Sequence, residues 1–247
     1  MKDEQLLRYS RQIMLPQIDV AGQQKLIDAT VLIVGMGGLG CPAAMYLAAA
    51  GVGHLMIADD DVVELTNLQR QVAHSHSMIG QPKVVSARKT LLGLNPDLKI
   101  TALQERLVGA NLSEAVSKAD LVLDACDNFT SRFAINAACI EHRKPLVSGA
   151  AIRMEGQIAV FDSRNPNSPC YQCLYSLGDD EDASCSENGV MAPLVGIIGA
   201  VQAMETIKLL TGIGESLTGR LLLLDASTLQ WREMRLPRDS NCGACSG

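Results

Sequence analysis

Short apolar runs alternate with helical patterns along the first 150 residues of this 247-residue chain. The runs are nearly continuous in Val, Ile, Leu and Ala, which is typical of strands buried on both faces of a parallel sheet. The stretches between them have the periodicity of the helices that join parallel strands. The predicted strands are 30–34, 55–59, 98–103, 121–125 and 146–148, and the predicted helices are 39–50, 83–94, 111–118 and 131–142.

The pattern changes after residue 149, where apolar and polar residues read as antiparallel strands around one long apolar helix. We therefore predict a Rossmann-like, doubly wound, mostly parallel α/β sheet that is extended by antiparallel strands. A single domain over 1–247 is expected from the length, with a nucleotide-binding half at about 28–150 and a second half at about 151–247. In the second half the predicted strands are 156–162, 219–225 and 228–236, the helix is 193–210, and 162–188 is a long loop.

The first predicted strand runs directly into a glycine-rich loop. The loop sequence GMGGLG has the G-x-G-x-x-G spacing of loops that wrap the phosphates of a nucleotide. A tight turn without a ligand is the alternative, but Asp59 ends the second strand about 20 residues further on, where an acid binds ribose hydroxyls. The spacing alone does not separate a dinucleotide from another nucleotide. The glycines predicted to contact the nucleotide are Gly35, Gly37, Gly38 and Gly40.

Cationic and amide side chains follow the predicted ribose-binding acid, in the segments LTNLQRQ and GQPKV. Arg70 and Lys83 are donors of the kind that hold a triphosphate, whereas a nicotinamide needs no such cations. Asp127 and Asn128 follow the fourth strand, and a carboxylate there can hold Mg²⁺ against phosphate oxygens. Solvated surface charges are the alternative for Arg70 and Lys83. Together with Asn67, these side chains predict an ATP site with Mg²⁺.

Eight cysteines occur in the chain, and four of them form two C-x-x-C pairs. Each pair places two sulfurs on one turn, so two pairs can complete a tetrahedral zinc site. Four protein ligands leave no open position, so this Zn²⁺ would be structural. Unrelated thiols or redox motifs are the alternatives. The predicted ligands are Cys170, Cys173, Cys242 and Cys245; Cys185 lies in the polar loop; Cys41, Cys126 and Cys139 are predicted core residues.

Charge and hydropathy limit the classes of partner. A formal net charge of −6 argues against a nucleic-acid partner and an anionic membrane surface, both of which favour a basic protein. The charged segment MKDEQLLRYSRQIML does not fit a secretory signal. The longest apolar stretches are interrupted and short for a bilayer span. We therefore expect a cytoplasmic protein.

Several segments together resemble the ThiF/MoeB family, the bacterial relatives of ubiquitin-activating enzymes. They are RYSRQI, GMGGLG, LTNLQRQ, GQPK, CDN, SGAAIRMEGQ, the paired C-x-x-C motifs and MAPLVGIIG, and they extend from about Arg8 to Cys245. The resemblance implies an ATP-dependent adenylyltransferase. Its substrate would be the C-terminal Gly-Gly carboxylate of a small ubiquitin-like sulfur-carrier protein, and its products an acyl-adenylate and pyrophosphate. The second half of the chain would then hold the carrier and the zinc.

The resemblance also implies individual roles for the candidate residues. Asp59 would bind ribose, and Asp127 would organise Mg²⁺ and be most sensitive to substitution. Arg11 resembles an arginine that family members extend across a homodimer interface into the partner's site. Cys185 would form a carrier thioester or take part in sulfur transfer, or have no covalent role. The residues that would hold the phosphates are Asn67, Arg70 and Lys83.

Two questions stay open on the sequence. The segment SGAAIRMEGQIAVF favours the molybdopterin-pathway carrier, whereas IADDD, TALQERL and LQWRE are closer to members that serve the thiamin-pathway carrier. We favour the molybdopterin branch. The other classes considered are an NAD(P)-dependent oxidoreductase, indicated by the same glycines, and a non-enzymatic zinc module, indicated by the four thiols. The four histidines are scattered and give no acid–base constellation for the oxidoreductase.

Overall fold

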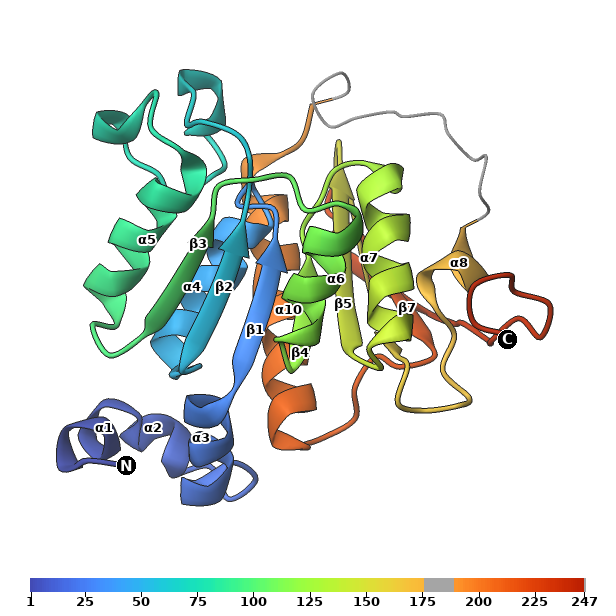
Figure 1. Cartoon of the computed structure of the whole chain (residues 1–247), viewed down its shortest axis with the longest axis horizontal. Coiled ribbons are helices and arrows are strands. Elements are labelled where there is room, and N and C mark those ends of the chain that lie inside the picture. The colour runs from blue at the N-terminus through green and yellow to red at the C-terminus, as the bar shows by residue number, and fades with distance from the viewer. Residues whose placement is uncertain (176–188, 247) are drawn as a thin grey trace.

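The computed structural model describes residues 1–175 and 189–246. In these residues eight strands form one sheet in the order β3-β2-β1-β4-β5-β6-β7-β8 (Figure 1). The first five in this order are parallel, and each later strand is antiparallel to its neighbour. The predicted mixed α/β fold is therefore confirmed. The strands are β1 (Thr30–Val34), β2 (His54–Ala58), β3 (Lys99–Leu103), β4 (Leu121–Asp124), β5 (Pro145–Ile152), β6 (Glu155–Asp162), β7 (Arg220–Asp225) and β8 (Gln230–Arg235).

Helices cover both faces of the sheet (Figure 1). Buried side chains of α4, α5 and α10 form one core with the strands, and those of α6 and α7 form the other. Such double coverage explains the continuous apolar runs of the parallel strands. The helices are α1 (Asp3–Arg8), α2 (Ser10–Ile13), α3 (Asp19–Asp28), α4 (Gly40–Ala50), α5 (Lys83–Leu94), α6 (Gly109–Ser117), α7 (Phe129–Glu141), α8 (Tyr171–Leu174) and α10 (Ala192–Thr211), with short 3₁₀ turns η1 (Leu65–Asn67) and η2 (His76–Met78).

The strand order reverses at β1, which pairs with β2 on one side and with β4 on the other. The connections from β1 to β2 and from β3 to β4 therefore leave in opposite directions. In open parallel sheets a crevice forms at such a switch point, beyond the carboxyl ends of the strands. The glycine loop after β1 and the residues after β2 and β4 all meet at this edge.

Helix α10 is the one described helix that is long and apolar enough to cross a membrane, by length and composition only. Half of its apolar window is buried inside the fold. The helix packs against β5, β6 and α4, in the middle of one core. We therefore interpret α10 as a core helix of the sheet.

The structure differs from the sequence prediction in several places. The helices α1 to α3 were not predicted; α1 and α2 contain no buried residue, so their sequences lack a strong apolar face. Strand β5 continues to Ile152, four residues beyond the predicted end. Gly149 lies in this extension, and a Cβ there would stand 2.5 Å from the buried Gln202 amide. Close packing against α10 therefore requires a glycine, which has low strand propensity.

The outermost strand, β8, pairs with β7 on one side and is exposed at each of its positions. The predicted antiparallel extension thus ends in a solvent-facing edge. The predicted long loop lies partly outside the described residues, and it contains the short helix α8.

Candidate active site and metal centre

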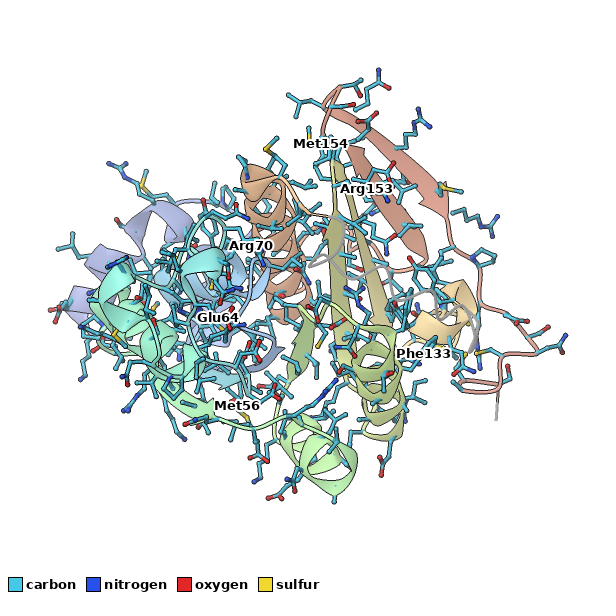
Figure 2. All side chains as sticks on the ribbon, turned by 90° about the horizontal axis from the view of Figure 1, so that it is seen from above. Met56, Glu64, Arg70, Phe133, Arg153 and Met154 are labelled. Carbon is cyan, nitrogen blue, oxygen red and sulfur yellow. The ribbon has the colours of Figure 1, made fainter. Side chains whose placement is uncertain are left out.

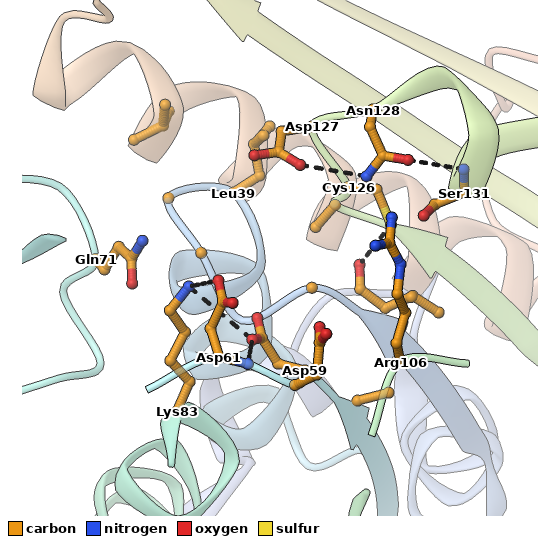
Figure 3. A pocket seen from close by; sticks show the side chains of 18 of the residues that line it. Leu39, Asp59, Asp61, Gln71, Lys83, Arg106, Cys126, Asp127, Asn128 and Ser131 are labelled. Carbon is orange, nitrogen blue, oxygen red and sulfur yellow. Dashed lines mark hydrogen bonds and ion pairs between the residues drawn. The ribbon is translucent and has the colours of Figure 1, made fainter. Parts of the chain in front are cut away.

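A cavity of about 280 Å³ lies at the switch point of the sheet (Figure 3). Its walls come from the glycine loop, from the segments after β2, β3 and β4, and from the start of α5. Segments distant in sequence thus meet at one edge, as the strand order requires. The predicted residues that line it are Gly35, Gly37, Gly38, Asp59, Arg70, Lys83, Asp127 and Asn128.

The glycine loop packs too closely for side chains at two of its positions. Gly35 has φ +97°, and a Cβ there would lie 2.8 Å from the Ala125 carbonyl oxygen. A Cβ on Gly40 would lie 1.9 Å from the carbonyl oxygen of Gly35. Gly37 is different, because a Cβ there would meet only the Gln71 amide at 3.7 Å. Gly35 and Gly40 therefore shape the loop, while Gly37 keeps its backbone open to the cavity.

Replacing Gly40 by alanine should destabilise the fold by about 3 kcal/mol, because a backbone oxygen blocks the new methyl group. For a chain of this length we expect the midpoint of thermal unfolding to fall by roughly 6–12 °C. Gly37→Ala is the matched control and should leave the midpoint within about 2 °C. Equal midpoints for the two variants in circular dichroism would contradict this account of the loop.

Asp59 and Lys83 form the floor of the cavity. The Asp59 carboxylate accepts hydrogen bonds from the backbone N–H groups of Met36 (2.7 Å) and Asp61 (2.9 Å). Lys83 Nζ lies 2.7 Å from Asp61 Oδ2 and 3.9 Å from Asp59 Oδ1. Burial raises the pKa of Asp59, and Lys83 and the two N–H donors only partly offset this. Asp61 was not predicted, and it holds the Lys83 ammonium in place (Figure 3).

The segment around η1 positions Arg70 and Gln71. Asn67 is buried, and its side-chain oxygen accepts a hydrogen bond from the Glu64 N–H (3.1 Å). The Asn67 carbonyl accepts from the N–H groups of Arg70 and Gln71. Asn67 is not among the residues that line the cavity, so its predicted phosphate contact stays a prediction. Gln71 is buried, lines the cavity and has an unpaired Oε1, and it was missed although it ends the motif LTNLQRQ.

The turn after β4 presents Asp127 to the cavity. Asn128 caps α7 by accepting a hydrogen bond from the Ser131 N–H (2.9 Å), and its amide lies 3.4 Å from Asp127 Oδ1. The Asp127 side chain is exposed and its contact with the Asn128 amide is long, so its carboxylate is available to a ligand (Figure 3). Asp124 is instead buried and accepts a hydrogen bond from the Ser148 hydroxyl at 2.8 Å.

Arg106, from the segment after β3, is a further cation at the cavity that sequence analysis missed (Figure 3). It lies in the segment TALQERL, which sequence analysis connected only with the choice of carrier, and the parallel sheet brings it near the glycine loop. Figure 2 shows Arg70 and Glu64 on the β1–β3 side of the molecule and Phe133 beside α8. Arg70 follows β2 in the chain and Arg106 follows β3, so the cavity has cations on two of its walls.

A second, larger cleft of about 560 Å³ adjoins the first. It lies against β5, β6 and β7, and its lining is largely aromatic and aliphatic, with Phe129, Tyr171, Tyr175 and Leu223. The two cavities share four residues, so one opens beside the other at the turn that carries Asp127. The shared residues are Leu39, Cys126, Asp127 and Ala151.

Arg132 lies between the two cavities and braces their common wall. Its buried guanidinium donates hydrogen bonds to the carbonyl oxygens of Cys126 (2.5 Å) and Gly149 (3.0 Å). Burial lowers the pKa of Arg132, but the Asp124 carboxylate and Tyr171 outweigh this, so the pKa is raised and the side chain stays charged. The turn before Asp127 is thereby fixed to β5.

The four predicted zinc ligands come together in one cluster. Their Sγ atoms lie within 4.8 Å of one another, and the Cys170–Cys242 and Cys173–Cys245 Sγ pairs are both 3.6 Å apart. All four cysteines are free. Tetrahedral Zn²⁺ with Zn–S bonds of about 2.3 Å requires sulfurs about 3.8 Å apart, so this donor set fits zinc. The cluster joins α8 to the C-terminal segment.

The remaining predicted residues lie elsewhere. Arg11 is exposed on α2 and does not line the cavity. Cys185 lies outside the described residues, so the structure says nothing of it. Cys41, Cys126 and Cys139 are buried as predicted. Burial raises the pKa of each of these three thiols, and that of Cys41 reaches about 12.

The switch-point cavity has the position and the lining expected of a nucleotide site in an α/β fold, and comparison with known proteins defines the chain further. The ThiF family matches residues 9–244, and the chain belongs to that family. It is 51% identical over 245 residues to the molybdopterin-synthase adenylyltransferase of Escherichia coli K12, covering 99% of this chain and 98% of that protein. It is 47% identical over 247 residues to the sulfur carrier protein ThiS adenylyltransferase of the same strain, covering 100% and 98%.

The fold also matches a more distant solved structure. The crystal structure of E. coli MccB with ATP superposes with a TM-score of 0.85 at 23% identity, covering 97% of this chain and 75% of that one. At this identity the likeness shows the fold alone. The predicted family and architecture are thus both confirmed.

Proposed function

We propose that this protein is an ATP-dependent adenylyltransferase that activates the C-terminal carboxylate of a small ubiquitin-like sulfur-carrier protein. The observation that carries the proposal is the junction of the two cavities at Asp127. A polar, cation-lined cavity suits a nucleotide, and the largely apolar cleft beside it suits a polypeptide tail. The adenylyltransferases that resemble the chain over its whole length support the same chemistry.

The reaction needs no nucleophile from the enzyme. An oxygen of the carrier's terminal carboxylate attacks the α-phosphorus of ATP, the bond between the α-phosphorus and the bridging oxygen breaks, and pyrophosphate leaves with the electron pair. The carboxylate is already ionised at neutral pH, so no proton must be removed. Negative charge grows on the leaving pyrophosphate, and fixed cations at the cavity stabilise it.

Individual roles follow from the positions of the side chains. Asp59 would accept hydrogen bonds from ribose hydroxyls, while Arg70 and Lys83 would contact the phosphates. Asp127 would hold Mg²⁺, which when bound supplies positive charge to the phosphate oxygens. Arg106 lies where it can add a further contact. The open backbone of Gly37 would face the phosphates. Gly35, Gly38 and Gly40 would help to shape the loop around them.

The second cleft would receive the carrier's tail. The wall shared with the nucleotide cavity includes the small side chain of Ala151, and Ala150 lines the cleft beside it. A tail that ends in Gly-Gly can pass such a narrow junction, because glycine has no side chain. We treat the chain as one domain, with nucleotide contacts from about 28–150 and carrier and zinc contacts from about 151–247.

The assembly is proposed to be a homodimer in which Arg11 reaches the partner's nucleotide. Large apolar side chains exposed on the N-terminal helices and the following turn support a partner at this surface, notably Leu7 at 77% and Met14 at 70% exposure. The four-thiol cluster would hold structural Zn²⁺. A cytoplasmic location accords with the seven cysteines of the described residues, all of which are free.

The test is carrier-dependent exchange of pyrophosphate into ATP. We expect exchange with a molybdopterin-pathway carrier, weaker exchange with a thiamin-pathway carrier, and none with either carrier lacking its last two glycines. Exchange without a carrier, or no exchange with either, would overturn the proposal. A preference for the thiamin-pathway carrier would reassign the branch but keep the chemistry. Membership of the ThiF family favours this reaction over the NAD(P)-dependent alternative.

A further inference from the structure

We propose that Asn136, a buried residue of α7, donates a hydrogen bond to the Cys170 thiolate when the four cysteines hold zinc. Its side-chain amide would join the metal centre to the helix that begins beside Asp127. The inference rests on the proposed zinc site, but it concerns a residue that is neither a cysteine nor part of the nucleotide cavity. It is carried by one hydrogen bond that the structure contains and by one donor that lacks a partner.

The first observation is a hydrogen bond between the Asn136 side chain and the backbone of the metal-binding turn. Asn136 is only 2% exposed, and its Oδ1 accepts a hydrogen bond from the Tyr171 N–H at 2.9 Å. Tyr171 directly follows the zinc ligand Cys170 and begins α8. The amide plane of Asn136 is therefore fixed against the metal-binding turn. Asn136 also lines a cavity with Cys170 and Cys245, so its amide lies beside the metal-binding cysteines.

The second observation is the unpaired donor of the same side chain, Asn136 Nδ2. Asn136 Nδ2 is buried and has no hydrogen-bond partner among the described residues. A buried amide donor without a partner costs about 1–3 kcal/mol, so such groups call for an explanation. Asn136 lines a cavity of about 190 Å³ together with the zinc ligands Cys170 and Cys245. Cys170 directly precedes Tyr171, whose N–H binds Asn136, so it is the zinc ligand next to this contact along the chain.

Zinc binding would turn Cys170 into a suitable acceptor. Zinc-bound cysteines are thiolates, and a thiolate accepts a hydrogen bond from an amide N–H far better than a neutral thiol does. Four thiolates also give the centre a net charge of −2, which a neutral donor stabilises without adding a further ligand. Asn136 would thus satisfy its own buried donor and strengthen the site at once.

Aromatic packing connects the contact between Asn136 and Tyr171 to the proposed tail cleft. The ring of Tyr171 lies edge-on to Phe133 of α7, with centroids 5.4 Å apart, and against Tyr175 at 5.0 Å. Both tyrosines line the cleft proposed for the carrier's tail. An amide that holds the Tyr171 backbone therefore also sets the position of that wall. Zinc retention and the shape of the cleft would depend on the same contact.

The experiment measures zinc affinity by competition with a chromophoric chelator, using the full-length protein. Asn136→Leu, of similar size but without the amide, should bind zinc about 10- to 100-fold more weakly. Asn95→Leu is the matched control, because Asn95 is an equally buried amide that binds Tyr9 and Ala48, far from the cysteines in sequence. Its zinc affinity should equal that of the unmodified protein. Asn136→Ala serves if the leucine variant does not fold.

A spectrum of the cobalt-substituted protein provides a readout independent of stability. A hydrogen bond to a thiolate withdraws electron density from sulfur, so its loss should move the thiolate-to-cobalt charge-transfer band of Asn136→Leu to longer wavelength. Unchanged zinc affinity and an unchanged band, as expected if Nδ2 faces a trapped water, would overturn the inference while leaving the zinc site intact. If the unmodified protein bound neither metal, the zinc proposal itself would fail.

Discussion

Replacing Asp127 by alanine should lower carrier-dependent ATP–pyrophosphate exchange by about 1000-fold, the largest catalytic loss that we expect from a single substitution. Its carboxylate is exposed at the junction of the nucleotide cavity and the tail cleft. The carboxylate makes a long 3.4 Å contact with the Asn128 amide, so the fold should lose little stability without it. The loss should therefore appear in the rate and in the response to Mg²⁺ concentration.

The control for Asp127→Ala is Glu141→Ala, which removes an exposed carboxylate at the other end of α7. We expect exchange within a factor of about 2 of the unmodified enzyme and the same thermal midpoint. If Asp127→Ala also kept its exchange rate, Asp127 would have no role in holding Mg²⁺. A matching loss in both variants would instead point to a general effect on α7.

Removing zinc should have the largest effect on stability. The cluster attaches the C-terminal segment to α8, and without metal four thiols would crowd together, Cys170 and Cys242 of them buried. Structural zinc contributes about 10–16 kcal/mol in zinc-finger peptides. If about 4 kcal/mol of this stabilises the present fold, the thermal midpoint should fall by roughly 8–16 °C. Calorimetry with and without a strong chelator measures the difference.

Cysteine variants separate metal loss from loss of a buried thiol. Cys242→Ser should lose zinc and reproduce the low midpoint, and chelator should then have no further effect. Cys139→Ala, which removes a buried thiol outside the cluster, should cost only about 1 kcal/mol and keep its zinc. A chelator that removed zinc from the unmodified protein without moving the midpoint would contradict a structural role.

Much of the fold could be predicted from the sequence because its parallel strands are buried on both faces. Strand β1 has the predicted bounds, and α5 does as well. Periodicity failed where burial is slight, as in α1 and α2, or where small residues replace branched ones, as in the second half of β5. Local patterns record how much of an element is buried, so elements with little or unusual burial escape them.

The candidate site followed a similar rule. Asp59, Arg70 and Lys83 belong to motifs with recognisable spacing, and the structure brings them to one cavity. Asp61, Gln71 and Arg106 line the same cavity, but their relevance depends on how separate loops meet. Asn67 belongs to a recognised motif, but it is buried and its side-chain oxygen accepts a hydrogen bond from the Glu64 N–H, so its phosphate contact stays a prediction. Motifs identify segments, whereas the three-dimensional structure decides which residues of a segment line the cavity.

The exposed outer strand β8 has a consequence for solubility. A strand at the edge of a sheet offers unpaired N–H and C=O groups to any other extended chain and is a common starting point for aggregation. Three of the six residues of β8 are charged: Arg232, Glu233 and Arg235. Charged side chains on an edge strand oppose pairing with a second extended chain. The charged residues of β8 thus limit aggregation at an edge of the sheet where the large apolar side chains of Trp231 and Met234 also face solvent.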